Sequence, residues 1–148
     1  MPSNLPVYQL TQYMVRRKVF KLFGSAFHLY DAAGNVVMYS KLKAFKLKED
    51  IRAYTGEDMQ SELLRISARN IIDIAATYDV FDSTTNEKVG ALRRKGLKSI
   101  VKDEWLFLNN SDQEVGLIGE DSMALALIRR MIAGTLIPQG FEGTMGNT

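Results

Sequence analysis

Basic side chains are concentrated in two stretches of the 148-residue chain, and their types and spacing suit the binding of anions. Residues 13–48 hold eight lysines and arginines against a single acid, Asp31, and residues 88–102 hold six against none. Clustered positive charge attracts acidic lipid headgroups, each basic residue contributing about 1 kcal/mol near a charged membrane. The residues predicted to bind an anionic lipid are Lys41, Lys43, Arg93, Arg94, Lys95 and Lys98.

The same charges have other interpretations. Lysine on a strand is a usual protection against edge-to-edge pairing, so the basic strands could be simply solvated faces. The basic face could instead meet an acidic protein, which would make the chain a protein-interaction module. Nucleic acid is a weaker alternative, because few exposed aromatic side chains can be assigned to the basic strands as stacking platforms.

No other cluster of residues predicts a catalytic or metal site. The pairs Glu49-Asp50 and Asp103-Glu104 lack the alternating acidic spacing of a calcium loop, so we expect turn or capping roles. His28 is the only histidine and stands without a cysteine or a serine-centred motif, which favours a structural role. No phosphate-binding glycine motif occurs either. We therefore predict a protein that is not an enzyme and needs no metal or cofactor.

Composition places the chain among ordinary globular domains. It is 46% hydrophobic and 24% charged with a net charge of +2, and it contains no cysteine, which excludes disulfides and thiolate ligands within it. No apolar run approaches the roughly 18 residues of a membrane span, and the first residues lack the pattern of a secretory signal. These features predict a single domain in the cytoplasm, with peripheral membrane contact at most.

The elements that would position the basic residues are strands. Alternating and β-branched residues predict strands over 13–23, 27–30, 36–44, 51–54, 63–67, 71–78, 105–108 and 114–118. Residues 59–67 could also form a helical turn. The lysines change phase between Lys43 and Lys46, which predicts a bulge or bend near Ala44.

One layout occurs three times, in residues 28–40, 79–93 and 106–119. Each has a strand, a turn led by Asp or Asn, and a return strand opened by valine. The first two also share a basic return strand followed by an acidic pair, so a unit of about fifty residues is duplicated. The repeat predicts a curled antiparallel sheet or partial β-barrel, mainly β. Residues 120–133 predict one apolar helix buried against it.

The order of these pieces resembles a known family. The runs YMVRRKVFKLFG, YDAAGNVV, KAFKLKEDI and ATYDVFD, followed by EKVGALRRKGLKSIVKDEW, resemble the LURF-one-related and scramblase-like branch of the Tubby C-terminal-like superfamily. The resemblance implies a closed antiparallel β-barrel around a central apolar helix. It also implies contact with membranes, because tubby-type domains bind phosphoinositides and scramblase relatives act at membranes.

The resemblance divides the chain into three parts. Residues 1–12 are a lead-in, residues 13–140 correspond to the Tubby C-terminal-like domain, and residues 141–148 are a tail with little to pack. The family's last strands and its C-terminal helix have no counterpart here. We therefore expect either a truncated form of a longer domain or a reduced one in which residues 120–133 take the central place.

Overall fold

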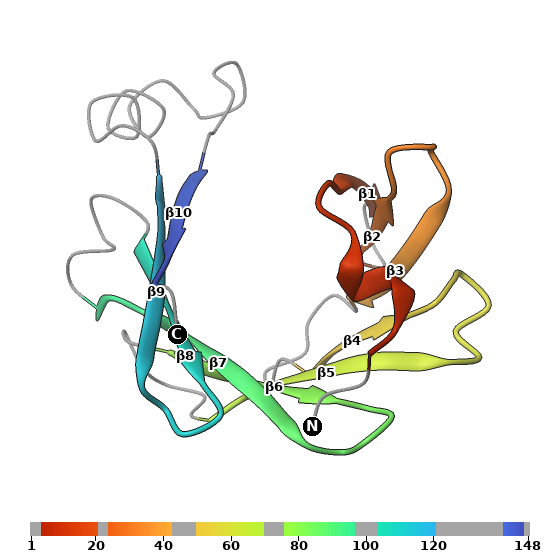
Figure 1. Cartoon of the computed structure of the whole chain (residues 1–148). Helices are drawn as coiled ribbons and strands as arrows, with labels where there is room; N and C mark the ends of the chain where they lie inside the picture. The colour runs from red at the N-terminus through yellow and green to blue at the C-terminus, as the bar shows by residue number, and fades with distance from the viewer. Residues whose placement is uncertain are drawn as a thin grey trace. The chain divides into compact units, whose positions relative to one another are not determined.

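The computed structural model describes residues 4–20, 24–42, 50–69, 76–96, 104–120 and 141–146. They form a short 3-10 helix, η1 (Pro6–Gln9), and ten strands of one antiparallel sheet (Figure 1). The order of strands in the sheet follows the chain from β1 to β10, and the mainly β prediction is confirmed. The strands are β1 (Met14–Phe20), β2 (Gly24–Tyr30), β3 (Val36–Leu42), β4 (Asp50–Tyr54), β5 (Glu62–Ala68), β6 (Thr77–Asp82), β7 (Lys88–Arg94), β8 (Glu104–Asn109), β9 (Glu114–Glu120) and β10 (Phe141–Met145).

Three of the connecting turns use the same chemistry, as their Asp or Asn leaders predicted. Asp31 Oδ1 accepts the backbone N–H of Asn35 at 2.8 Å, and Asp82 Oδ1 accepts that of Thr84 at 2.8 Å. Asn109 Oδ1 accepts two backbone N–H groups of its turn, both at 2.9 Å. A side-chain acceptor of this kind satisfies donors that the reversing backbone cannot pair, so each leader fixes its hairpin.

The contacts divide the chain into two compact units. The first unit comprises Met1–Ala68 and Val80–Val89, and the second comprises Arg69–Asp79 and Gly90–Thr148. In the first unit the buried apolar side chains are Ala26, Tyr39, Ala53 and Leu63, and in the second they are Ala91 and Leu108. Most other strand residues of the described ranges are half-buried, so each unit has a modest core.

One prediction is confirmed over its alternative and one needs correction. The strand predicted over 63–67 is β5, and the alternative of a helical turn over 59–67 is wrong; Met59, just before β5, adopts a left-handed φ of 53°. The predicted tail of residues 141–148 contains strand β10, which pairs antiparallel with β9. A sheet ladder is made by backbone groups, so a glycine-rich segment with few apolar side chains can still join it. Gly116 helps, because a Cβ there would lie 2.5 Å from the Thr144 carbonyl oxygen of β10.

Other predictions fall outside the described residues. These are the bulge near Ala44 and nearly all of the predicted helix over residues 120–133; its first residue, Glu120, is the last residue of β9. Within the ranges that the structure describes, no helix has the length and apolar character needed to cross a bilayer.

Candidate functional site

Strands β1, β2 and β3 place basic side chains in cross-strand rows. Lys18 pairs with Ala26 and Ala26 pairs with Lys41, so the two lysines lie on one face on either side of a buried alanine. Arg16 occupies the same face one pair further along, opposite His28. Arg17 belongs to the other face, because side chains alternate along a strand. We call Arg16, Arg17, Lys18 and Lys41 the basic surface; all four are exposed.

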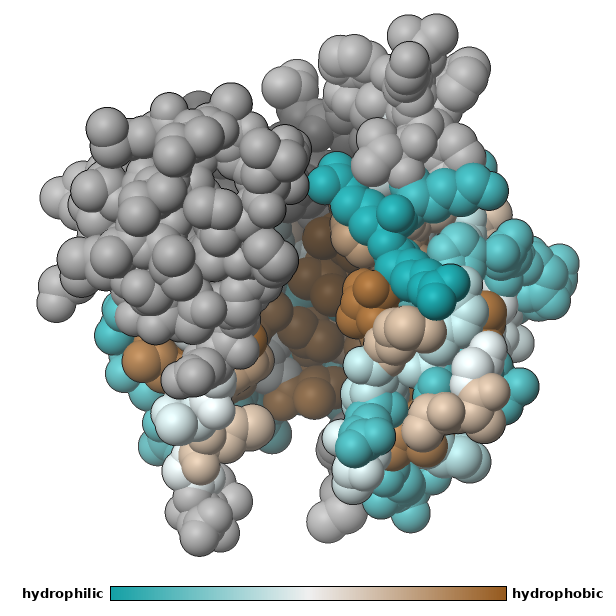
Figure 2. Space-filling model, turned by 90° about the horizontal axis from the view of Figure 1, so that it is seen from above, coloured by the Kyte–Doolittle hydropathy of each residue, from teal (hydrophilic) through white to brown (hydrophobic). Residues whose placement is uncertain are grey.

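Aromatic rings of β2 orient the two arginines. The Arg16 guanidinium carbon lies 5.5 Å from the centroid of the Tyr30 ring, and that of Arg17 lies 5.7 Å from the Phe27 ring. Cation–π contacts at exposed sites contribute about 0.5–1 kcal/mol. They hold both guanidinium groups beside the rings of β2, while both arginines remain exposed. In Figure 2, hydrophilic (teal) side chains gather at the right, the side on which β1, β2 and β3 lie in Figure 1.

His28 is engaged beneath this surface. Its Nε2 lies 2.7 Å from Glu57 Oε1, its ring stacks on Tyr30 and it meets the edge of Tyr39. Burial raises the pKa of the Tyr39 phenol, and the nearby Glu57 charge raises it further, so Tyr39 stays protonated. These contacts fit the predicted structural role: His28 joins β2 to the loop between β4 and β5.

The second basic stretch is less available to an outside anion. Arg93, Arg94 and Lys95 are half-buried, and Lys95 Nζ lies 3.5 Å from Glu104 Oε2. In the order of strands, β4, β5 and β6 separate β3, which carries Lys41, from β7, which carries Arg93 and Arg94. Lys43 and Lys98 lie outside the described residues.

The basic surface is only partly the site that the sequence predicted. Lys41 was among the predicted residues, whereas Arg16, Arg17 and Lys18 were noted as basic but not chosen. The sequence could have predicted part of this surface, because side chains two residues apart on a strand, such as Arg16 and Lys18, point to the same face. Their row with Lys41 depends on the register of β1, β2 and β3, which no local pattern specifies.

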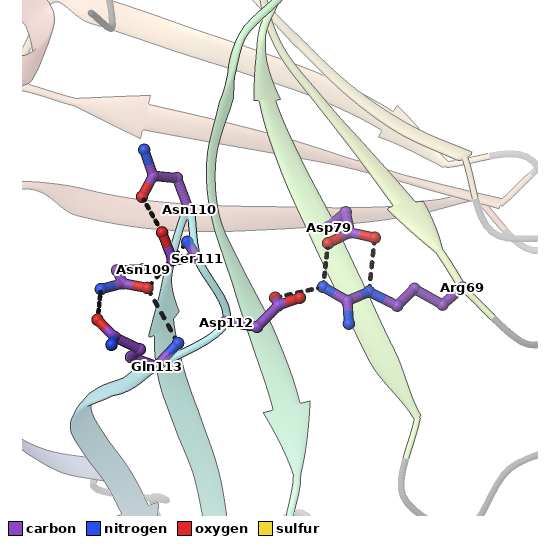
Figure 3. A network of polar contacts seen from close by, with 7 residues as sticks. All are labelled: Arg69, Asp79, Asn109, Asn110, Ser111, Asp112 and Gln113. Atoms are coloured by element: carbon purple, nitrogen blue, oxygen red, sulfur yellow. Dashed lines mark hydrogen bonds and ion pairs between the residues drawn. The ribbon is translucent and has the colours of Figure 1, made fainter.

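A polar network of the second unit was not predicted. Arg69 forms a bidentate pair with Asp79, and its Nη2 also donates to Asp112 Oδ1 at 2.5 Å. Figure 3 shows Asp112 reaching this guanidinium from the turn that Asn109 leads. The hydrogen bonds that Arg69 donates to Asp79 and then to Asp112 raise the pKa of Arg69, which is permanently charged. Because one guanidinium contacts both acids, the cluster fastens the Asn109-led turn to strand β6, which carries Asp79.

The acidic pairs likewise serve as strand partners. Asp50 begins β4 and accepts from Arg52, with Arg52 Nη2 3.1 Å from Asp50 Oδ2, while Glu104 begins β8 and pairs with Lys95. Glu49 and Asp103 lie outside the described residues. Within the described ranges, no group of three or more His, Cys, Asp or Glu side chains is placed to hold a metal ion.

Comparisons of the chain with protein-family models, with curated proteins and with solved structures found no match.

Proposed function

We propose that the chain is a non-enzymatic, tubby-like domain of the LURF-one-related type that binds acidic phospholipid headgroups. Binding is peripheral and occurs through the basic strands, at the cytoplasmic leaflet where anionic lipids are concentrated. The observation that carries the proposal is the row formed by Lys18, Ala26 and Lys41, with Arg16 beside it on the same exposed face. No cofactor is needed for such a contact.

The charge of this region supports membrane attachment. Among the described residues between Met14 and Leu42, four basic side chains (the basic surface) stand against one acid, Asp31. At about 1 kcal/mol per basic residue near an anionic surface, the three that share one face, Arg16, Lys18 and Lys41, supply about 3 kcal/mol, roughly a hundredfold in affinity. Because exposed charges are screened by salt, the attraction should fall steeply as ionic strength rises.

The proposal shifts the main contact from β7 to the first unit. Half-buried side chains lose part of their reach to an outside headgroup, and Glu104 already compensates the charge of Lys95. Arg16, Arg17 and Lys41 are exposed and have no acidic residue opposite them in the β1–β2–β3 registers.

Vesicle co-sedimentation with two matched variants tests this assignment. One variant is Arg16→Gln, Arg17→Gln and Lys41→Gln; the other is Arg93→Gln, Arg94→Gln and Lys95→Gln. Each removes three positive charges, so the pair separates the position of charge from its amount. Phosphatidylcholine vesicles with and without phosphatidylserine or a phosphoinositide would be compared at low and physiological salt.

We expect wild type to bind only the anionic vesicles, and the first variant to bind at least about tenfold more weakly than the second. Equal losses in both would contradict the assigned surface and indicate a response to net charge alone. No binding by a folded wild type would overturn the lipid function.

The position of β1 supports a second candidate function. β1 is the first strand in the sheet order, and in the described ranges it pairs only with β2. An exposed strand edge can accept an extended segment of another protein, and three basic side chains on β1 would favour an acidic one. Hydrogen exchange of the β1 amides, measured with and without an acidic peptide, tests this alternative in a chain that does not bind vesicles. Exchange rates that the peptide leaves unchanged would contradict it.

A further inference from the structure

Apolar side chains are exposed immediately before the basic residues of β1. Four of the eight large apolar side chains that the described residues expose lie between positions 10 and 15. Their exposed fractions are 36% for Leu10, 43% for Tyr13, 43% for Met14 and 58% for Val15. Arg16, Arg17 and Lys18 follow without a break. Several apolar side chains exposed within one short segment, followed directly by one sign of charge, call for a partner that is both apolar and anionic. We call Leu10, Tyr13, Met14 and Val15 the apolar cluster.

The strand is unusual because neither of its faces is covered here. Residues 11–18 are exposed throughout, so Met14 on one face and Val15 on the other are both accessible. A strand of a soluble sheet normally buries one face. Burying a large apolar side chain fully contributes about 1.5–3 kcal/mol. Burial of these residues by a partner would therefore add to the binding free energy independently of the charges.

Hydrogen bonds fix this apolar cluster in place. The Tyr13 hydroxyl donates to the Val7 carbonyl oxygen at 2.5 Å, which joins the start of β1 to helix η1. The Tyr8 hydroxyl in turn donates to the Leu63 carbonyl oxygen at 3.3 Å, which joins η1 to β5. The cluster is therefore presented by the first unit as an ordered part of its surface.

We propose that Leu10, Tyr13, Met14 and Val15 insert into the interfacial region of an anionic bilayer. The arginines that follow remain at the level of the headgroups. This inference rests on the proposed lipid function and adds an apolar anchor to it. Tyrosine suits such a depth, because its ring is apolar and its hydroxyl is polar.

Charge complementarity selects a bilayer over a second copy of the chain as the occupant. Pairing β1 with β1 of another molecule would bring Arg16, Arg17 and Lys18 close to the same three cations, and like charges on facing strands are destabilising. An anionic bilayer offers negative headgroups to these cations and hydrocarbon to their apolar neighbours at adjoining depths.

Site-specific labelling can test the insertion, because the chain has no cysteine of its own. Met14→Cys would carry an environment-sensitive fluorophore, and Thr85→Cys, in the exposed turn between β6 and β7, would carry it as the matched control. Both labelled proteins would be mixed with vesicles of phosphatidylcholine and phosphatidylserine, with and without brominated acyl chains. Co-sedimentation of the same samples reports binding independently.

We expect the label at position 14, but not the label at position 85, to shift to the blue and to be quenched by brominated chains. Co-sedimentation without these changes at position 14 would overturn the anchor and leave headgroup binding intact. Absence of co-sedimentation would instead overturn the proposed function. A blue shift that grows with protein concentration in the absence of vesicles would show that a second copy covers the cluster, and would also overturn the anchor.

An unlabelled variant provides a second measure. Met14→Ser with Val15→Ser removes two anchors and leaves every charge in place. We expect vesicle binding to weaken about tenfold and its residual part at high salt to disappear. Affinity equal to wild type at both salt concentrations would contradict insertion.

Discussion

The guanidinium of Arg69 donates two parallel hydrogen bonds to the carboxylate of Asp79, at 2.7 Å from Nε and 2.6 Å from Nη2. Bidentate arginine–carboxylate pairs are among the strong hydrogen bonds of proteins, and the third contact with Asp112 ties a turn 43 residues away to the same group. About a third of the Arg69 side chain is exposed, so solvent screening limits its contribution to stability.

Replacing Arg69 should therefore destabilise the protein moderately. We expect Arg69→Gln to lower the free energy of unfolding by about 1 kcal/mol, because Asp79 and Asp112 would be left near one another without a cation. Arg69→Lys keeps the charge but cannot make two parallel bonds, so its effect should be intermediate. Urea unfolding measures both, and equal stability of Arg69→Gln and wild type would contradict the role of this network.

Gly90 should not tolerate a side chain. A Cβ at this position would overlap the carbonyl oxygen of Leu108 in the neighbouring strand β8. We expect Gly90→Ala to cost about 1–3 kcal/mol, because the two strands would have to separate. Gly56→Ala is the matched control: its nearest atom would be Asp58 Oδ1 at 3.7 Å, so unfolding should change by less than about 0.5 kcal/mol. Similar melting temperatures for the two variants would refute the close approach.

Asp82 should be essential for its turn. Its side chain is fully buried, and Oδ1 accepts backbone N–H groups from Thr84 at 2.8 Å and Thr85 at 3.2 Å. Asp82→Ala would leave these donors without that acceptor, which should cost about 1–3 kcal/mol. Asp58 accepts a similar bond from Gln60 but is exposed, so water can replace it in Asp58→Ala. Chemical denaturation of both variants checks the difference; equal losses would show that burial is not the cause.

Asp31 should make the first hairpin sensitive to acid. Hydrogen bonds from the Asn35 side chain, and then from the Asn35 backbone, lower the pKa of the Asp31 carboxyl. Since the folded pKa is depressed, the stabilisation is complete above the unfolded pKa of about 4 and is lost as pH falls through the folded value. An NMR titration should show the Asp31 pKa rising toward its ordinary value in Asn35→Ala. Identical titration in both proteins would exclude Asn35 as the cause.

Local chemistry made the hairpins predictable. The leaders Asp31, Asp82 and Asn109 were recognisable because the chemistry of an Asx turn is contained within four or five residues. The strands around them followed from period-two alternation, which also lies within one short segment.

Relations between distant segments were not predictable in the same way. Strand β10 was missed because its partner β9 precedes it by about twenty residues and Phe141–Met145 contains little that alternates. The contact of Arg69 with Asp112 joins a strand end to a remote turn, and nothing in either segment specifies the other. Met14 and Val15 are exposed because no other described segment packs over them. The alternation of residues within a strand does not predict which segments will cover it.

The agreement between strand order and chain order also bears on how the protein forms. Each described strand hydrogen-bonds to the strands that precede and follow it in the chain. Pairing of two strands therefore does not require a strand that is several elements away in the sequence. During synthesis at the ribosome, every new strand after the first emerges to find its neighbour already present. Sheets assembled from such short loop closures fold faster than those with long crossovers, and their unpaired edges are exposed for less time to aggregation.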